Sequence, residues 1–141
     1  MVDQLLNMVM VPTRDIAAIR QFYEVGLGWS TWGPQSPISV MYRAGTAVIV
    51  FLDAAYLAKE SGIEASNGPK SIWAVFLNDK GGVDPMMARA VAAGATVTSP
   101  VRDRDGGLYS GYFTDPEGNG WEIVWSPHMP VGGDGGLTLG G

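Results

Sequence analysis

The segment from Gly111 to Trp125 most constrains the fold, because it has the pattern of two strands joined by a tight turn. The turn, residues 115–119, reads Asp-Pro-Glu-Gly-Asn; proline fixes one backbone dihedral, and glycine or asparagine tolerates a positive φ. The flanking runs are aromatic and β-branched, which is typical of paired, half-buried strands. Glu122 lies within the second run, between Trp121 and Ile123. A carboxylate at that position indicates either a solvated face or the lining of a site.

The composition predicts one globular domain that spans residues 1–141. Hydrophobic residues make up 46% of the chain and charged residues 16%, which is typical of a folded protein. With 9 Lys and Arg and a formal net charge of −5, the chain lacks the basic cluster that a nucleic-acid partner requires. No apolar run approaches the roughly 20 residues of a membrane span, and the N-terminus lacks the pattern of a signal peptide. The absence of cysteine excludes disulfides and thiolate metal sites, and we expect a cytoplasmic protein without a membrane partner.

Residues 5–56 predict a first module of one strand, one helix and three further strands. Ile16, Ile19 and Phe22 recur at helical spacing and indicate the inward face of the helix. The expected elements are a strand over 5–11, a helix that begins at Thr13 or Asp15 and ends near Gly26 and Gly28, and strands over 29–32, 38–43 and 46–52.

The same order of elements is predicted again in residues 71–127, after a connector over 57–70. Asp84 followed by Pro85 indicates a helix start, since it combines an N-cap with proline at the first helical position. The expected elements are strands over 71–77, 95–98, 108–114 and 121–126, a helix that ends at Gly94, and a Gly-rich tail over 128–141. Two βαβββ modules side by side predict an α+β fold, a curved eight-stranded sheet with helices outside and a concave cleft inside.

Four motifs follow one another along the chain: Val-Pro-Thr-Arg-Asp at 11–15, Gln-Phe-Tyr-Glu-Val-Gly-Leu-Gly at 21–28, Ala-Ala-Gly-Ala-Thr-Val at 92–97 and Phe-Thr-Asp-Pro-Glu-Gly-Asn-Gly-Trp-Glu at 113–122. In this order they resemble the vicinal oxygen chelate superfamily, which includes glyoxalase I, extradiol dioxygenases and bleomycin-resistance proteins. The resemblance spans residues 5–127. It implies the paired-module fold, but a shared fold does not assign the chemistry.

The resemblance also implies where a catalytic metal would bind. Metal-dependent members place four ligands, typically His and Glu, on four strands, and these positions correspond here to Met8, Val50, Ile72 and Glu122. Trp73 takes the third position if the register slips by one residue. A divalent metal needs about three or four nitrogen or oxygen donors, and the single histidine, His128, lies beyond the last strand. We therefore expect no metal and no cofactor in this position.

The other use of such a cleft is binding, as in the bleomycin-resistance branch, whose members resemble this chain in lacking the metal ligands. Those proteins act as dimers that sequester a drug in clefts near the subunit interface. The resemblance thus implies a homodimer that binds a small hydrophobic or aromatic ligand, with antibiotic sequestration as one use. Strand alternation puts apolar side chains in the cleft, and aromatic rings are expected at its rim. The expected ligand-binding residues are Met8, Met10, Trp32, Tyr42, Val50, Ile72, Phe76, Tyr109, Tyr112 and Glu122.

Other interpretations of the same residues stay open. Met8 and Met10 are compatible with plain core packing. Glu122 is a candidate general acid or base of a metal-free enzyme, or a structural acid paired with Arg43 or another basic residue across the sheet. A glyoxalase- or dioxygenase-like lyase or oxygenase with an unrecognised metal site is a further alternative.

Overall fold

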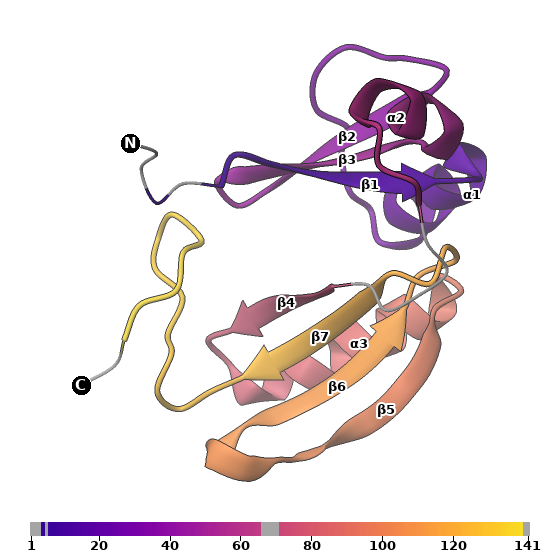
Figure 1. Ribbon diagram of the computed structural model, residues 1–141. Coiled ribbons are helices and arrows are strands. Elements are labelled where there is room, and N and C mark those ends of the chain that lie inside the picture. The colour runs from indigo at the N-terminus through magenta and orange to yellow at the C-terminus, as the bar shows by residue number, and fades with distance from the viewer. Residues whose placement is uncertain (1–3, 5, 66–70, 140–141) are drawn as a thin grey trace.

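The computed structural model describes residue 4 and residues 6–65 and 71–139, which form two modules, one above the other in Figure 1. Leu5, the end of the predicted connector and the last two residues of the tail lie outside this part of the chain. The elements are β1 (Met8–Thr13), α1 (Ile16–Arg20), η1 (Gln21–Gly26), β2 (Ser39–Ala44), β3 (Ala47–Asp53), α2 (Ala54–Ser61), β4 (Ile72–Leu77), η2 (Lys80–Gly82), α3 (Val83–Ala92), β5 (Thr96–Asp103), η3 (Asp105–Gly107), β6 (Tyr109–Thr114) and β7 (Gly120–Trp125). No helix in the described part is long and apolar enough to cross a membrane.

The first sheet has the strand order β1-β3-β2, with β1 parallel and β2 antiparallel to β3. The strand predicted over 29–32 is reduced to one bridge between Thr31 and Tyr42. It stays short because Gly28 and Gly33, on either side, adopt positive φ angles of 75° and 79°, which turn the chain out of an extended path. Among the described residues the fold therefore has seven strands in two sheets, not the eight that the sequence predicted.

The second sheet has the order β4-β7-β6-β5, in which β4 runs parallel to β7 and the other neighbours are antiparallel. β6 and β7 are the strands predicted around the 115–119 turn, and Gly118 has the positive φ of 81° that this turn requires. Both modules follow one plan, in which the first strand lies parallel beside the last. The α+β class and the pairing of two similar modules are confirmed.

The α-helices α1 and α2 begin at side-chain caps, whereas α3 does not. Asp15 caps α1 by accepting a backbone hydrogen bond, as predicted, and the helix continues as the π-helix η1. Asp84 is not a cap, because α3 already includes it and follows directly from the 3-10 turn η2, which Asp79 caps. α2 spans the end of the predicted first module and the start of the predicted connector, and Asp53 caps it.

One hydrophobic core joins the two modules. Tyr23 on η1 is fully buried; its ring stacks on Phe51 of β3 with centroids 5.1 Å apart, and it contacts Trp121 of β7 at 6.4 Å. Trp73 of β4 also contacts the ring of Phe51, at 6.4 Å. Met87 brings α3 into the same cluster. The helices therefore pack with the residues of both sheets.

Each sheet has a second face that is turned away from this core, which we call the open face. On β1 the alternation of side chains places Val11 in the core and leaves Met10 57% exposed on the open face. On β4 it places Trp73 against the core and leaves Ile72 61% exposed. The open faces carry Met8, Met10, Val48 and Val50 in the first sheet, and Ile72, Ala74, Phe76, Ser110, Tyr112, Glu122 and Val124 in the second.

The Gly-rich tail folds back on itself and is held at its base. A bridge between Val131 and Leu137 closes the loop. The side-chain amide of Asn78 donates to the Val131 carbonyl at 2.9 Å and accepts from the Val131 N–H at 2.7 Å. In Figure 1 the yellow tail rises from the end of β7 toward the first module, and Gly135 approaches Gly45 in the β2–β3 turn.

Candidate functional site

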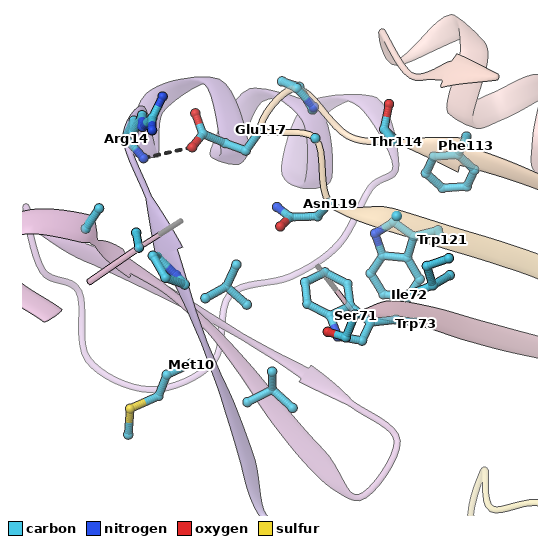
Figure 2. A pocket seen from close by; sticks show the side chains of 18 of the residues that line it. Met10, Arg14, Ser71, Ile72, Trp73, Phe113, Thr114, Glu117, Asn119 and Trp121 are labelled. Carbon is cyan, nitrogen blue, oxygen red and sulfur yellow. Dashed lines mark hydrogen bonds between the residues drawn. The ribbon is translucent and has the colours of Figure 1, made fainter. Parts of the chain in front are cut away.

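A cavity of about 820 Å³ lies between the two modules, where the 115–119 turn approaches β1 (Figure 2). Met10 projects from β1 on one side, and Ile72 lies on the opposite side. At one end the backbone N–H of Arg14 donates to the carboxylate of Glu117 at 2.8 Å. The volume falls in the range of sites that bind small molecules.

Met10, Ile72 and Tyr112, all predicted to contact a ligand, line this cavity together. Glu122 borders the cavity without lining it. It pairs across β6 and β7 with Tyr112, and Gly120, the preceding residue on the same face of β7, belongs to the cavity wall. The structure thus brings four of the predicted positions to one region.

Met8, Val50 and Phe76 lie on the open faces but outside the cavity wall. Met8 is 36% exposed, whereas Val50 is buried beside Met10, its register partner on β1. Phe76 is half-buried on β4. A ligand contact for these three residues stays a prediction.

Trp32, Tyr42 and Tyr109, predicted at the rim, are not among the residues that line this cavity, and a ligand contact for them stays a prediction. Tyr42 is fully buried on the core side of β2. Tyr109 also faces the core side, where its hydroxyl donates to Asp84 of α3 at 2.6 Å. Trp32 lies beside β2 and is 43% exposed. Strand alternation explains both tyrosines, because their positions in β2 and β6 send the side chains to the helix side of each sheet.

Glu122 is half-buried on β7 and contacts hydroxyl groups. The Ser110 Oγ donates to Glu122 Oε2 at 2.8 Å. Partial burial raises the pKa of Tyr112, and hydrogen bonding to Glu122 and the negative charge of Glu122 raise it further. Arg43, the basic partner suggested by the sequence, lies instead on the first sheet with its guanidinium 5.4 Å from the ring of Trp32.

Arg104 completes this polar group from the end of β5. Its guanidinium donates to Ser99 Oγ at 2.9 Å, to the Pro100 carbonyl at 3.0 Å and to the Ser110 carbonyl at 3.2 Å. It also lies 4.9 Å from the ring centroid of Tyr112, within the range of a cation–π contact. Arg104 and Ser110 were not predicted from the sequence, although the alternation of β6 relates Ser110 to Tyr112.

Asp115, the first residue of the turn, has a structural role. It is 4% exposed, and its carboxylate accepts from the backbone N–H groups of Glu117 and Asn119, each at 2.9 Å, and from the Asn119 side chain at 2.8 Å. The Tyr23 hydroxyl donates to it at 2.6 Å and accepts from Trp121 Nε1 at 2.9 Å. The turn therefore fixes one wall of the cavity and joins the modules.

The four positions that correspond to metal ligands do not form a metal site in this chain. In the first module Met8 pairs with Val48, two residues before Val50. In the second module Ile72 pairs with Gly120, two residues before Glu122. The backbone arrangement is thus the same in both modules, but of these four side chains Glu122 alone offers an oxygen donor. Trp73, the alternative third position, lies against the core. The described residues also contain no group of three or more His, Cys, Asp or Glu that could hold a metal, so they do not fit a divalent ion.

The fold and the order of the motifs define a class of proteins built from paired βαβββ modules. The model of the Glyoxalase/Bleomycin resistance protein/Dioxygenase superfamily matches residues 5–123, and the chain belongs to this superfamily. The resemblance inferred from the four motifs is therefore confirmed. A comparison with curated proteins gives no significant match.

Solved structures with this fold match most of the chain. It is similar to a glyoxalase-related enzyme from Fulvimarina pelagi, at 29% identity and a TM-score of 0.89 over 98% of this chain and 99% of that chain. A glyoxalase/bleomycin resistance protein/dioxygenase family enzyme from Burkholderia phytofirmans PsJN matches at 28% identity and a TM-score of 0.74, over 84% of this chain and 96% of that one. A lactoylglutathione lyase from Agrobacterium tumefaciens shares the fold at 20% identity and a TM-score of 0.69, over 88% and 95% of the two chains.

Proposed function

We propose that the protein binds a small hydrophobic or aromatic molecule without a metal, and that it sequesters this molecule, an antibiotic being one candidate. The cavity of about 820 Å³ between the modules carries the proposal. Its wall combines the apolar side chains Met10 and Ile72 with the aromatic residues Trp73, Phe113 and Trp121. The donor positions of a metal-dependent relative are mostly apolar here, which favours binding over metal-assisted catalysis.

The aromatic and apolar residues of the cavity wall can provide micromolar affinity for such a ligand. An aromatic contact with good geometry contributes about 0.5–1.5 kcal/mol beyond the burial of its area. Micromolar affinity corresponds to about −8 kcal/mol. Two or three ring contacts together with the burial of apolar ligand surface reach that range.

We also propose that the protein acts as a homodimer in the cytoplasm. β1 and β4 are edge strands, and their open faces expose Met8, Met10 and Ile72. Full burial of a side chain of this size contributes about 1.5–3 kcal/mol, so a second copy that covers these residues would be stabilised. Analytical ultracentrifugation tests this part, and a monomer at micromolar concentrations would contradict it.

Ligand titration and elemental analysis test the binding proposal. Planar aromatic compounds should quench tryptophan fluorescence in a saturable way and raise the unfolding temperature, because a ligand at 100 times its Kd adds about 2.7 kcal/mol of stability. Ile72→Asp should weaken this binding at least tenfold, while the control Val91→Asp on the exposed side of α3 leaves it unchanged. One tightly bound metal ion per chain in protein purified without chelator would overturn the proposal.

A further inference from the structure

Glu122 presents a carboxylate on the open face, and its hydrogen-bond partners are neutral. The Ser110 hydroxyl lies 2.8 Å from Oε2, and Tyr112 lies beside it as the cross-strand neighbour. Two ion pairs among the described residues, Arg20–Glu24 and Lys80–Asp103, do not include Glu122. Burial of a charge is costly unless the charge is paired, so a half-buried carboxylate in this setting favours a cationic partner.

Arg104, the basic residue of the same polar group, is already engaged. Its donors go to Ser99, Pro100 and Ser110, and its planar face lies against the ring of Tyr112. These contacts hold the Tyr112 ring in place. They direct the guanidinium toward backbone and hydroxyl oxygens.

The surroundings of Glu122 suit an amphipathic ligand. Ala74, its register partner on β4, is exposed, and Ile72, 61% exposed, adds apolar surface on the same face. Tyr112 is at once a neighbour of Glu122 and part of the cavity wall. An aromatic group seated in the cavity therefore has a short path along the open face to the carboxylate.

We propose that Glu122 recognises a protonated amine carried by the ligand, so that the one acidic side chain among the four metal-ligand positions binds an organic cation. An ammonium group supplies up to three donors, and a hydrogen bond between charged groups is stronger than one between neutral groups. The inference rests on the proposed binding function and narrows the ligand to aromatic or apolar amines. In this proposal Ser110 and Tyr112 orient the carboxylate of Glu122 toward the amine.

Three probes with the same ring separate this inference from the binding proposal itself. 1-Naphthylmethylamine is cationic at neutral pH, 1-naphthylmethanol is neutral, and 1-naphthoate is anionic. Isothermal titration calorimetry with the full chain should show the amine binding about tenfold more tightly than the alcohol, and the carboxylate binding most weakly. Glu122→Gln should remove the advantage of the amine and leave the alcohol within about twofold. Glu60→Gln on exposed α2 removes the same charge elsewhere and serves as the control.

A second pair of variants covers the case in which Glu122→Gln does not fold. Ala74→Lys places an ammonium group beside Glu122 from the neighbouring strand, and Ala74→Met adds similar bulk without charge. The lysine variant should lose the preference for the amine over the alcohol, whereas the methionine variant should keep it.

The outcomes distinguish the two proposals. If all three probes bind with equal affinity, or if Glu122→Gln weakens the alcohol as much as the amine, the role of Glu122 is overturned and the binding function stands. A tighter complex with the carboxylate overturns the inference in favour of Arg104 as the recognition point. If no probe binds saturably, the proposed binding function fails first.

Discussion

The hydroxyl of Tyr23 donates a 2.6 Å hydrogen bond to the carboxylate of Asp115, a residue of the other module. The same hydroxyl accepts the indole N–H of Trp121 at 2.9 Å. One oxygen atom thus connects the π-helix η1 with the turn and the last strand of the second module. All three side chains are buried, so water does not replace these bonds when one is removed.

Tyr23→Phe should destabilise the protein by about 3 kcal/mol. The substitution keeps the ring but removes one hydrogen bond from the Asp115 carboxylate and one from the Trp121 indole N–H. Urea unfolding followed by tryptophan fluorescence measures the change. Tyr56→Phe, on the exposed side of α2, is the matched control and should change stability by less than about 0.5 kcal/mol. Equal losses in the two variants would contradict the connecting role.

Stability should fall steeply above about pH 10. Burial raises the pKa of Tyr23, and the Asp115 charge adds to the effect; burial and then hydrogen bonding to Glu24 raise the pKa of Tyr42. The unfolded tyrosines ionise near pH 10, before the folded ones, so rising pH favours unfolding by about 1.4 kcal/mol per pH unit for each residue. Below pH 10 both states hold the proton and this effect is absent.

Urea unfolding between pH 9 and pH 11 measures this dependence, and the lack of cysteine keeps thiol ionisation out of the curve. Tyr42→Phe should lower the slope by about 1.4 kcal/mol per pH unit, because this side chain then no longer ionises in the unfolded state. A slope that is the same in the wild type and in this variant would show that Tyr42 does not contribute.

Gly26→Ala should cost about 2 kcal/mol, because η1 and α3 come into close contact at this point. A Cβ at Gly26 would overlap the Cβ of Ala93 and lie 3.1 Å from its Cα, and backbone does not move aside as a flexible side chain does. Gly133→Ala meets nothing within 4 Å and is the control. In a double-mutant cycle, Ala93→Gly should recover part of the loss. If the two substitutions show no coupling energy, the contact between Gly26 and Ala93 is not the source of the loss.

Asn78→Ala should release the tail without unfolding the core. The alanine removes both hydrogen bonds to Val131, so the Val131 amide should exchange hydrogen at least tenfold faster. Asn78→Asp keeps an acceptor for the Val131 N–H but loses the donor, and it should give an intermediate rate. Global stability should change by less than about 1 kcal/mol. A large global loss in Asn78→Ala would mean that the tail belongs to the cooperative core.

The sequence predicted the order and type of most elements, because apolar alternation and turn residues are local signals. The predictions that were wrong depend on neighbouring segments, which the local sequence pattern does not describe. The strand over 29–32 was cut short by the two flanking glycines, and Asp84 lost its capping position because η2 leads directly into α3. In both cases a neighbouring segment decided the outcome.

Strand alternation separates the predicted site residues into those on the open faces and those on the core side. Met10, predicted from strand alternation, and Ile72, predicted from the resemblance, line the cavity, and Glu122, also predicted from the resemblance, borders it. Tyr42 and Tyr109 were expected at the rim as aromatic residues, whereas strand alternation directs both side chains to the core side. The contacts of Arg104 depend on how its long side chain folds back over β6, which no strand period predicts.

The separation between the turn at 115–119 and the open face has an evolutionary consequence. The residues that fasten the modules together, with Asp115 at their centre, are different from the residues that would hold a metal. A lineage can therefore exchange the donors at positions such as Met8 or Ile72 without losing its scaffold. In such a protein the sequence motif identifies the superfamily but not the function, because the reaction or ligand can change while the motif is retained.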